Sequence, residues 1–216
     1  LISVPADLVS DAIDSLSENG GLVCDKVANL NVCYLTELYE AETYTAERLK
    51  SMVGLKTKSS ANIERLITKL ESLYDISYAP LQKQSIELAL NNRILVITGG
   101  PGTGKTTILK GILSLYDELE LETLLAAPTG RAAKRMSELT GREASTIHRL
   151  LGAKMAEDGE TVVFSKHEGD PLNCDALVLD ECSMVDITLM SSLLKALKPG
   201  CRLVLVGDAD QLPSVG

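Results

Sequence analysis

The pattern of hydrophobic and polar positions changes after Tyr78, and the part before that residue is mostly helical. Over 5–19, apolar residues recur at helical spacing until Asn19 and two glycines end the pattern. The predicted elements are a helix at 5–19, strands at 22–27 and 31–35, and helices at 36–52 and 61–73 around a polar loop at 54–60. We therefore expect a small, mostly helical segment and linker over 1–75.

Beyond Tyr78, short continuous apolar runs alternate with helical stretches. The runs cover 94–98, 123–127, 176–179 and 202–206, and the helical stretches lie near 104–116, 130–139, 145–151 and 186–197. Glycine, proline or charge bounds each run, as expected of strands buried on both faces. This alternation predicts an α/β domain over 76–216 in which a parallel sheet lies between helices.

Composition agrees with a soluble globular chain. Of the 216 residues, 45% are hydrophobic and 24% are charged. No apolar run approaches the roughly 20 residues that cross a bilayer, and no secretory signal opens the chain, so we expect a cytoplasmic protein without a membrane partner. The five cysteines form no C-x-x-C pair, which fits a reducing cytosol and favours buried apolar thiols over zinc or disulfides.

The net charge of −9 argues by itself against a nucleic-acid partner, because phosphate binding needs local positive charge. One segment departs from this balance. Residues 127–154 hold six basic side chains and two acidic ones, a local charge of +4. The basic residues are Arg131, Lys134, Arg135, Arg142, Arg149 and Lys154, and the acidic ones are Glu138 and Glu143. Such a patch suits nucleic acid but also a solvated helix face, so charge alone decides nothing.

A phosphate-binding loop follows the run at 94–98. Residues 99–106 read GGPGTGKT, a full match to G-x-x-x-x-G-K-[ST] between a predicted strand and a predicted helix. Glycines let successive N–H groups point inward at phosphate, Lys105 would neutralise the β- and γ-phosphates, and Thr106 would ligate Mg²⁺. The predicted nucleotide-binding residues are Gly99, Gly100, Pro101, Gly102, Thr103, Gly104, Lys105, Thr106 and Thr107. The alternative is a glycine-rich turn without a ligand.

Two carboxylates end the run at 176–179. In a parallel sheet the strand ends share one edge, so Asp180 can reach a Mg²⁺ ion beside Thr106, and Glu181 can orient and deprotonate a water molecule. A charged strand terminus facing solvent is the alternative interpretation. After the last run, Gln211 is a candidate sensor, because a neutral amide can bond a γ-phosphate and lose that bond after hydrolysis.

Taken together, these motifs resemble superfamily-one helicases, and the RecD-like branch most of all. The segments that carry the resemblance are GGPGTGKT at 99–106, APTGRAA at 127–133, STIHRLL at 145–151, DECSMVD at 180–186 and GDADQLPSVG at 207–216. The resemblance covers about residues 79–216. It implies a RecA-like P-loop NTPase core that hydrolyses ATP, moves on single-stranded DNA and unwinds it 5′-to-3′. That branch includes stand-alone helicases and the alpha subunit of exodeoxyribonuclease V.

The resemblance also implies roles for individual residues. Gln82 falls where such helicases carry an adenine-reading glutamine, and Gln84 is a competing candidate in the same stretch. Thr129 corresponds to a residue that touches the single-strand backbone. Thr146 and His148 lie in a second DNA-contacting segment, and a helix-surface histidine is the alternative interpretation of His148. Arg131, in the basic segment that spans both elements, is a candidate phosphate contact.

The part before residue 76 resembles the family less. Residues 34–42 are similar to the linker that precedes the motor in stand-alone RecD-like proteins, and a helix followed by a hairpin is typical of the closing part of a winged helix. Residues 1–78 contain 12 acidic and 7 basic side chains. We therefore expect this winged-helix-like segment to pack against the motor rather than to bind DNA alone.

Other functions stay open at this point. The APTGRAA and STIHRLL segments disfavour an AAA+ remodelling machine. An RNA helicase is harder to distinguish from a DNA helicase, because contacts to the nucleic-acid backbone carry little sequence information. Glu181 disfavours a regulatory nucleotide binder, since binding alone needs no base. The resemblance implies a second, C-terminal motor domain that supplies arginines to the γ-phosphate, and it allows other recombination or repair subunits as partners. Arg131, Arg135, Arg142 and Arg149 precede the acidic pair, and we expect them to be poorly placed to replace those arginines.

Overall fold

A parallel five-stranded sheet organises the second part of the chain. The computed structural model describes residues 5–57, 63–100, 102–159 and 161–208. In spatial order the strands are β3 (Ile94–Thr98), β9 (Arg202–Gly207), β8 (Ala176–Leu179), β4 (Thr123–Ala127) and β5 (Ala144–Thr146). All four neighbouring pairs are parallel, which confirms the predicted α/β class.

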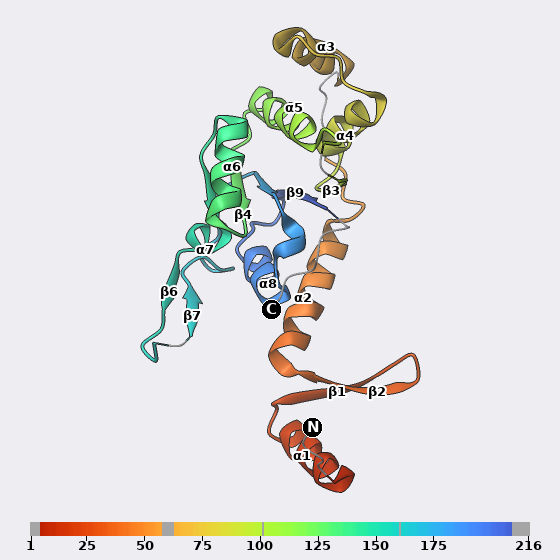
Figure 1. Cartoon of the computed structure of the whole chain (residues 1–216), viewed down its shortest axis with the longest axis vertical. Coiled ribbons are helices and arrows are strands. Elements are labelled where there is room, and N and C mark those ends of the chain that lie inside the picture. The colour runs from red at the N-terminus through yellow and green to blue at the C-terminus, as the bar shows by residue number, and fades with distance from the viewer. Residues whose placement is uncertain (1–4, 58–62, 101, 160, 209–216) are drawn as a thin grey trace.

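Helices cover both faces of this sheet. The helices on one face are α3 (Ile63–Tyr74), α4 (Pro80–Asn91), α5 (Lys105–Glu118) and α6 (Gly130–Thr140), and those on the other are α2 (Thr36–Met52), α7 (Ile147–Leu150) and α8 (Ile187–Lys195). The side chains of β8 alternate between the two resulting cores, Val178 in the first and Leu177 and Leu179 in the second. Figure 1 shows α5 and α6 beside one another above the sheet, with α2 and α8 below it.

Two expectations for the sheet are corrected. Strand β8 is buried on both faces, but Val96 of β3 is 54% exposed, because β3 is an edge strand of the described sheet. The helix predicted at 145–151 is wrong over its first part: residues 144–146 form β5, and a helix of four residues follows. The prediction did not include α4 or the antiparallel hairpin of β6 (Ala153–Met155) and β7 (Val162–Phe164).

The N-terminal elements follow the predicted order. Helix α1 (Ala6–Glu18) is succeeded by an antiparallel hairpin of β1 (Leu22–Val27) and β2 (Leu30–Leu35), which Figure 1 places beyond the far end of α2. No residue of α1 is buried, and Cys24 and Cys33 are exposed on the hairpin because no layer covers it. The expectation of buried thiols is thus wrong for this pair, whereas Cys174 and Cys201 are buried. The winged-helix-like character stays a prediction.

Helix α2 packs against the α/β domain. Its Arg48 Nη2 donates to the Leu197 carbonyl oxygen at 3.1 Å, just after the end of α8, and its Tyr44 hydroxyl donates to Glu168 Oε1 at 2.8 Å. Met52 is buried in the same core as α8. Of the helices within the described residues, none is long and apolar enough to cross a membrane.

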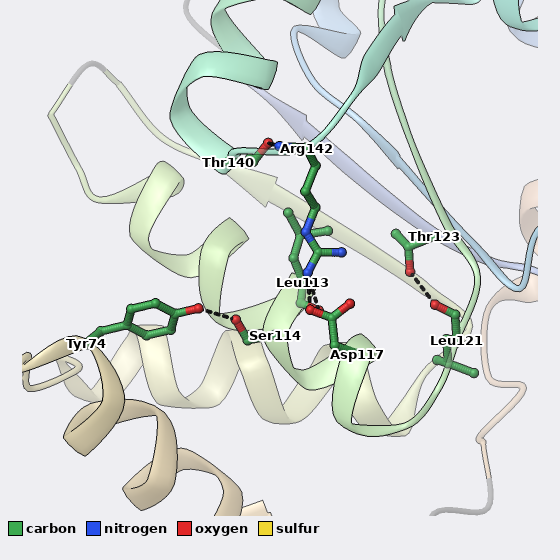
Figure 2. A network of polar contacts seen from close by, with 8 residues as sticks. All are labelled: Tyr74, Leu113, Ser114, Asp117, Leu121, Thr123, Thr140 and Arg142. Carbon is green, nitrogen blue, oxygen red and sulfur yellow. Dashed lines mark hydrogen bonds and ion pairs between the residues drawn. The ribbon is translucent and has the colours of Figure 1, made fainter.

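Polar contacts on both sides hold α5 in place (Figure 2). On one side, the Arg142 guanidinium forms an ion pair with Asp117 and also donates to the Leu113 carbonyl oxygen at 3.4 Å. On the other, the Tyr74 hydroxyl of α3 lies 2.6 Å from Ser114 Oγ. Since α5 begins at Lys105, these contacts fix the helix that follows the phosphate loop.

Candidate nucleotide site and nucleic-acid face

The predicted phosphate loop lies between β3 and α5 with the backbone conformation that its glycines allow. Gly102 and Gly104 have φ values of +77° and +86°, in the left-handed region that a Cβ atom disfavours. Lys105 Nζ folds over the loop, where it donates to the Gly99 carbonyl oxygen and, at 2.9 Å, to that of Gly100. The lysine is thus positioned at the mouth of the loop, where phosphate would bind.

A cavity of about 310 Å³ opens beside this loop and joins it to the acidic pair. Its walls come from the loop, α5, α6 and the ends of β8 and β9. The lining residues are Gly100, Gly102, Thr103, Gly104, Lys105, Thr106, Leu109, Arg135, Met136, Leu139, Thr140, Asp180, Glu181, Val206, Gly207 and Asp208. The sequence-based expectation that Lys105, Thr106, Asp180 and Glu181 meet at one edge of the sheet agrees with this geometry.

The acidic pair is held in a tight turn after β8. The Glu181 N–H donates to Asp180 Oδ1 at 2.9 Å, and Glu181 itself has a φ of +53°, a left-handed conformation that costs about 1–2 kcal/mol for a non-glycine residue. Close packing sets this turn: a Cβ atom on Gly207 would lie 2.8 Å from Cys182 Sγ. Burial raises the pKa of the Cys182 thiol, and the Asp180 carboxylate adds to this, so the thiol stays neutral beside the pair.

The donor set fits Mg²⁺ bound together with phosphate. No group of three or more His, Cys, Asp and Glu side chains is placed to hold a metal by itself within the described ranges. Mg²⁺ in phosphate sites needs no such cage, because one or two protein oxygens, the phosphates and water complete its octahedron. The Thr106 hydroxyl and the Asp180 carboxylate line one cavity and are the residues that would hold the ion.

Gln82 is brought to the phosphate loop and Gln84 is not. A Cβ atom on Gly104 would lie 2.5 Å from Gln82 Nε2, so the amide rests directly on the loop. Gln82 Oε1 accepts a hydrogen bond of 2.9 Å from the Ala79 N–H, which fixes the side chain at the start of α4. Gln84, two residues on, is exposed. Of the two candidates, Gln82 is the one that lies beside the phosphate loop, and its reading of adenine stays a prediction.

The two threonines predicted to touch DNA are both helix N-caps. Thr129 Oγ1 accepts from the Ala132 N–H at 3.2 Å at the start of α6, and Thr146 Oγ1 accepts from the Arg149 N–H at 3.2 Å at the start of α7. Ala127, at the end of β4, is the parallel partner of Thr146 in β5. The two caps therefore follow neighbouring strands at the same sheet edge as the phosphate loop.

Other predicted nucleic-acid residues lie near these caps. Arg131 is exposed on the first turn of α6. His148 is exposed on α7, and its ring lies 5.9 Å from the Phe164 ring of the β6–β7 hairpin. The basic segment is partly neutralised, because Arg142 pairs with Asp117 and Lys134 lies 3.9 Å from Glu138.

The sequence matches a known family over most of this region. A family described as an AAA domain matches residues 82–216, more than half of the chain. The chain belongs to this family. The phosphate loop and the acidic pair that line the cavity described above both lie within the matched residues.

Similar proteins confirm the resemblance to RecD-like helicases. The ATP-dependent RecD2 DNA helicase of Deinococcus radiodurans is 39% identical over 182 residues, which cover 84% of this chain and 24% of that protein. RecBCD enzyme subunit RecD of Mycobacterium tuberculosis is 43% identical over 157 residues, 62% of this chain and 26% of that subunit. ATP-dependent DNA helicase dda of Enterobacteria phage T4 is 40% identical over 123 residues, 56% of this chain and 28% of that helicase. The chain thus spans about a quarter of the length of these relatives.

Two ionisable residues of the AAA domain reach the cavity without having been predicted there. Asp208, just after β9, is 7% exposed, and the carboxylate following an apolar run was a usable signal. Arg135 of α6 also lines the cavity, whereas its inability to replace the arginines of a second domain stays a prediction. Its position depends on which face of α6 turns toward α5. The predicted residues Pro101 and Gln211 lie outside the described residues.

Proposed function

We propose that this chain is the ATP-binding part of a motor that hydrolyses ATP to move 5′-to-3′ on single-stranded DNA and to unwind duplex DNA. The observation that carries the proposal is the shared cavity of Lys105, Thr106, Asp180 and Glu181 at one sheet edge. The relatives support it, since their names describe ATP-dependent DNA helicases and a RecBCD subunit.

Each side chain of the cavity has a defined task in this proposal. Lys105 neutralises the β- and γ-phosphates, and the inward N–H groups of the glycine-rich loop bind their oxygens. Thr106 and Asp180 hold Mg²⁺, which supplies further positive charge to the phosphates. Glu181 orients the attacking water and accepts its proton, and Gln211 senses the γ-phosphate. Gln82 donates and accepts hydrogen bonds at the adenine edge.

The nucleic-acid face is the edge formed by the two N-caps. Helix N-termini favour phosphate, because their free N–H groups and positive dipole ends point outward. Thr129 at the start of α6 therefore contacts a DNA backbone, Arg131 adds a cation, and Thr146 before the short helix α7 provides a second contact. His148 stacks on or bonds the strand beside the β6–β7 hairpin.

The motor also needs a second RecA-like domain in this proposal. Such a domain closes over the nucleotide and supplies arginines to the γ-phosphate, and a change in the separation of the two domains produces the movement. We place the protein in the cytoplasm, and other recombination or repair subunits are candidate partners. The free cysteines of the described residues fit a reducing compartment.

The test compares ATP hydrolysis by the protein that contains this chain with no polymer, with single-stranded DNA and with RNA of the same length. The proposal predicts stimulation by DNA that exceeds stimulation by RNA, and no stimulated hydrolysis in the Lys105→Ala variant. Stronger stimulation by RNA would assign the motor to RNA, and nucleotide binding without hydrolysis under any condition would make the chain a regulatory module.

A further inference from the structure

Helix α6 connects the two predicted binding regions within a few turns. Its N-cap Thr129 lies at the nucleic-acid edge, whereas Arg135, Met136, Leu139 and Thr140 line the nucleotide cavity. These four positions are spaced i, i+1, i+4 and i+5, so they share one side of the helix. Met136 is 1% exposed and anchors that side in the core beneath α5. Arg135 therefore belongs to a face whose orientation is fixed by packing.

The charges of the cavity leave a role for a second cation. Three carboxylates line it, those of Asp180, Glu181 and Asp208, and Lys105 and Arg135 are the two cations on its wall in the part of the chain that the structure describes. A triphosphate with about four negative charges would meet repulsion from these carboxylates that Mg²⁺ and one lysine only partly offset. Arg135 would lower the negative charge that remains after Mg²⁺ and Lys105 are counted.

Arg135 is also available for a ligand. Its neighbours on α6 have partners: Lys134 lies 3.9 Å from Glu138, and Arg142, just beyond the helix, pairs with Asp117. Among the described residues, the Arg135 guanidinium has neither an ion-pair nor a hydrogen-bond partner. A planar guanidinium offers a fork of N–H donors that matches phosphate oxygens, and such charge-assisted bonds are stronger than neutral ones.

We propose that Arg135 binds the terminal phosphate of the nucleoside triphosphate from within this same domain, and so sets the preference for a triphosphate over a diphosphate. The inference rests on the proposed ATP site and extends it by one residue. Because Arg135 is about 1.7 turns from the Thr129 cap, the helix that starts at the nucleic-acid face also holds the group that contacts the phosphate lost on hydrolysis.

The test measures binding of fluorescent ATP and ADP analogues with Mg²⁺ to the wild-type chain and to variants of α6. We expect Arg135→Ala and Arg135→Gln to weaken ATP binding by about 10–100-fold and ADP binding much less. Arg135→Lys should retain part of the ATP affinity, since the charge remains without the fork. The matched control is Lys134→Ala, the preceding residue on the same helix, which is exposed and outside the cavity lining and should leave both affinities unchanged.

The ratio of ATP to ADP affinity separates a phosphate contact from a loss of structure. Equal weakening of both nucleotides, or an unchanged ratio in the Gln variant, overturns the assignment of Arg135 while the ATP site stands. Failure of the wild-type chain to bind either nucleotide overturns the proposed function and this inference together. Because Arg135 is exposed, its variants should unfold at the wild-type temperature, which circular dichroism will check.

Discussion

The contact between Gln82 and the phosphate loop allows a quantitative test through the change Gly104→Ala. Gly104 has a φ of +86°, and a Cβ atom there costs about 1–2 kcal/mol in backbone strain. The same Cβ would lie 2.5 Å from Gln82 Nε2, so the amide must move away. That movement breaks the 2.9 Å bond from the Ala79 N–H to Gln82 Oε1, worth about 0.5–1.5 kcal/mol. We expect a total loss of about 1.5–3.5 kcal/mol in the free energy of unfolding.

Gly102→Ala is the matched control. Gly102 shares the left-handed conformation, with a φ of +77°, but a Cβ atom there meets nothing within 4 Å. Its replacement should cost the backbone strain alone, about 1–2 kcal/mol. Urea unfolding followed by circular dichroism measures the free energy of unfolding of both variants. The same two glycine replacements are then measured in a protein that also carries Gln82→Ala. In that background the cost of Gly104→Ala should fall to the Gly102→Ala value. Equal costs at the two glycines, with no coupling to Gln82, would refute the described contact.

Three further predictions follow from other parts of the molecule. Glu181→Gln keeps the side-chain shape but removes the base, so nucleotide should still bind while hydrolysis by the intact protein falls by about 10²-fold or more; near-normal turnover would move the base elsewhere. Arg131→Ala should lower the slope of log affinity against log salt for single-stranded DNA by about one, and an unchanged slope would remove Arg131 from the phosphate contacts. Burial, with Glu168 adding to it, raises the pKa of Tyr44 to about 12, so this hydroxyl contributes stability below pH 10 that is lost between about pH 10 and 12. Partial solvent exposure limits this contribution to about 1 kcal/mol. Between pH 9 and 11.5, the free energy of unfolding measured in urea should therefore fall by about 1 kcal/mol less in Tyr44→Phe than in the wild type.

Much of the α/β domain is predictable from sequence because its signals are local. The run 176–179 is apolar at every position, and β8 is buried on both faces, so pattern and structure agree. The phosphate loop is likewise specified by glycines where the chain needs φ above zero, at Gly102 and Gly104. The acidic pair follows from the rule that parallel strands end at one edge.

The features that sequence did not predict depend on tertiary packing. Ser145 and Thr146 pair with β4 although the surrounding pattern is helical, because a neighbouring strand end offers hydrogen-bond partners there. Gln82 and Gln84 are the same residue type on the same helix, so the sequence does not distinguish them. Only the rotation of α4 about its axis turns Gln82 toward Gly104. Arg135 reaches the nucleotide cavity because Met136 anchors α6 beneath α5, a contact that no local spacing specifies.

Binding of a fluorescent ATP analogue in the presence of Mg²⁺ tests the central claim most directly, with Lys105→Ala as the variant and Lys110→Ala as its control. Both lysines lie on α5, but Lys105 lines the cavity and Lys110 is exposed elsewhere on the helix. The account predicts Mg²⁺-dependent binding by the wild type and by Lys110→Ala, and an affinity lower by more than about tenfold in Lys105→Ala, since the phosphates lose their main protein cation. Equal binding by all three proteins would contradict the assignment of this cavity as the ATP site.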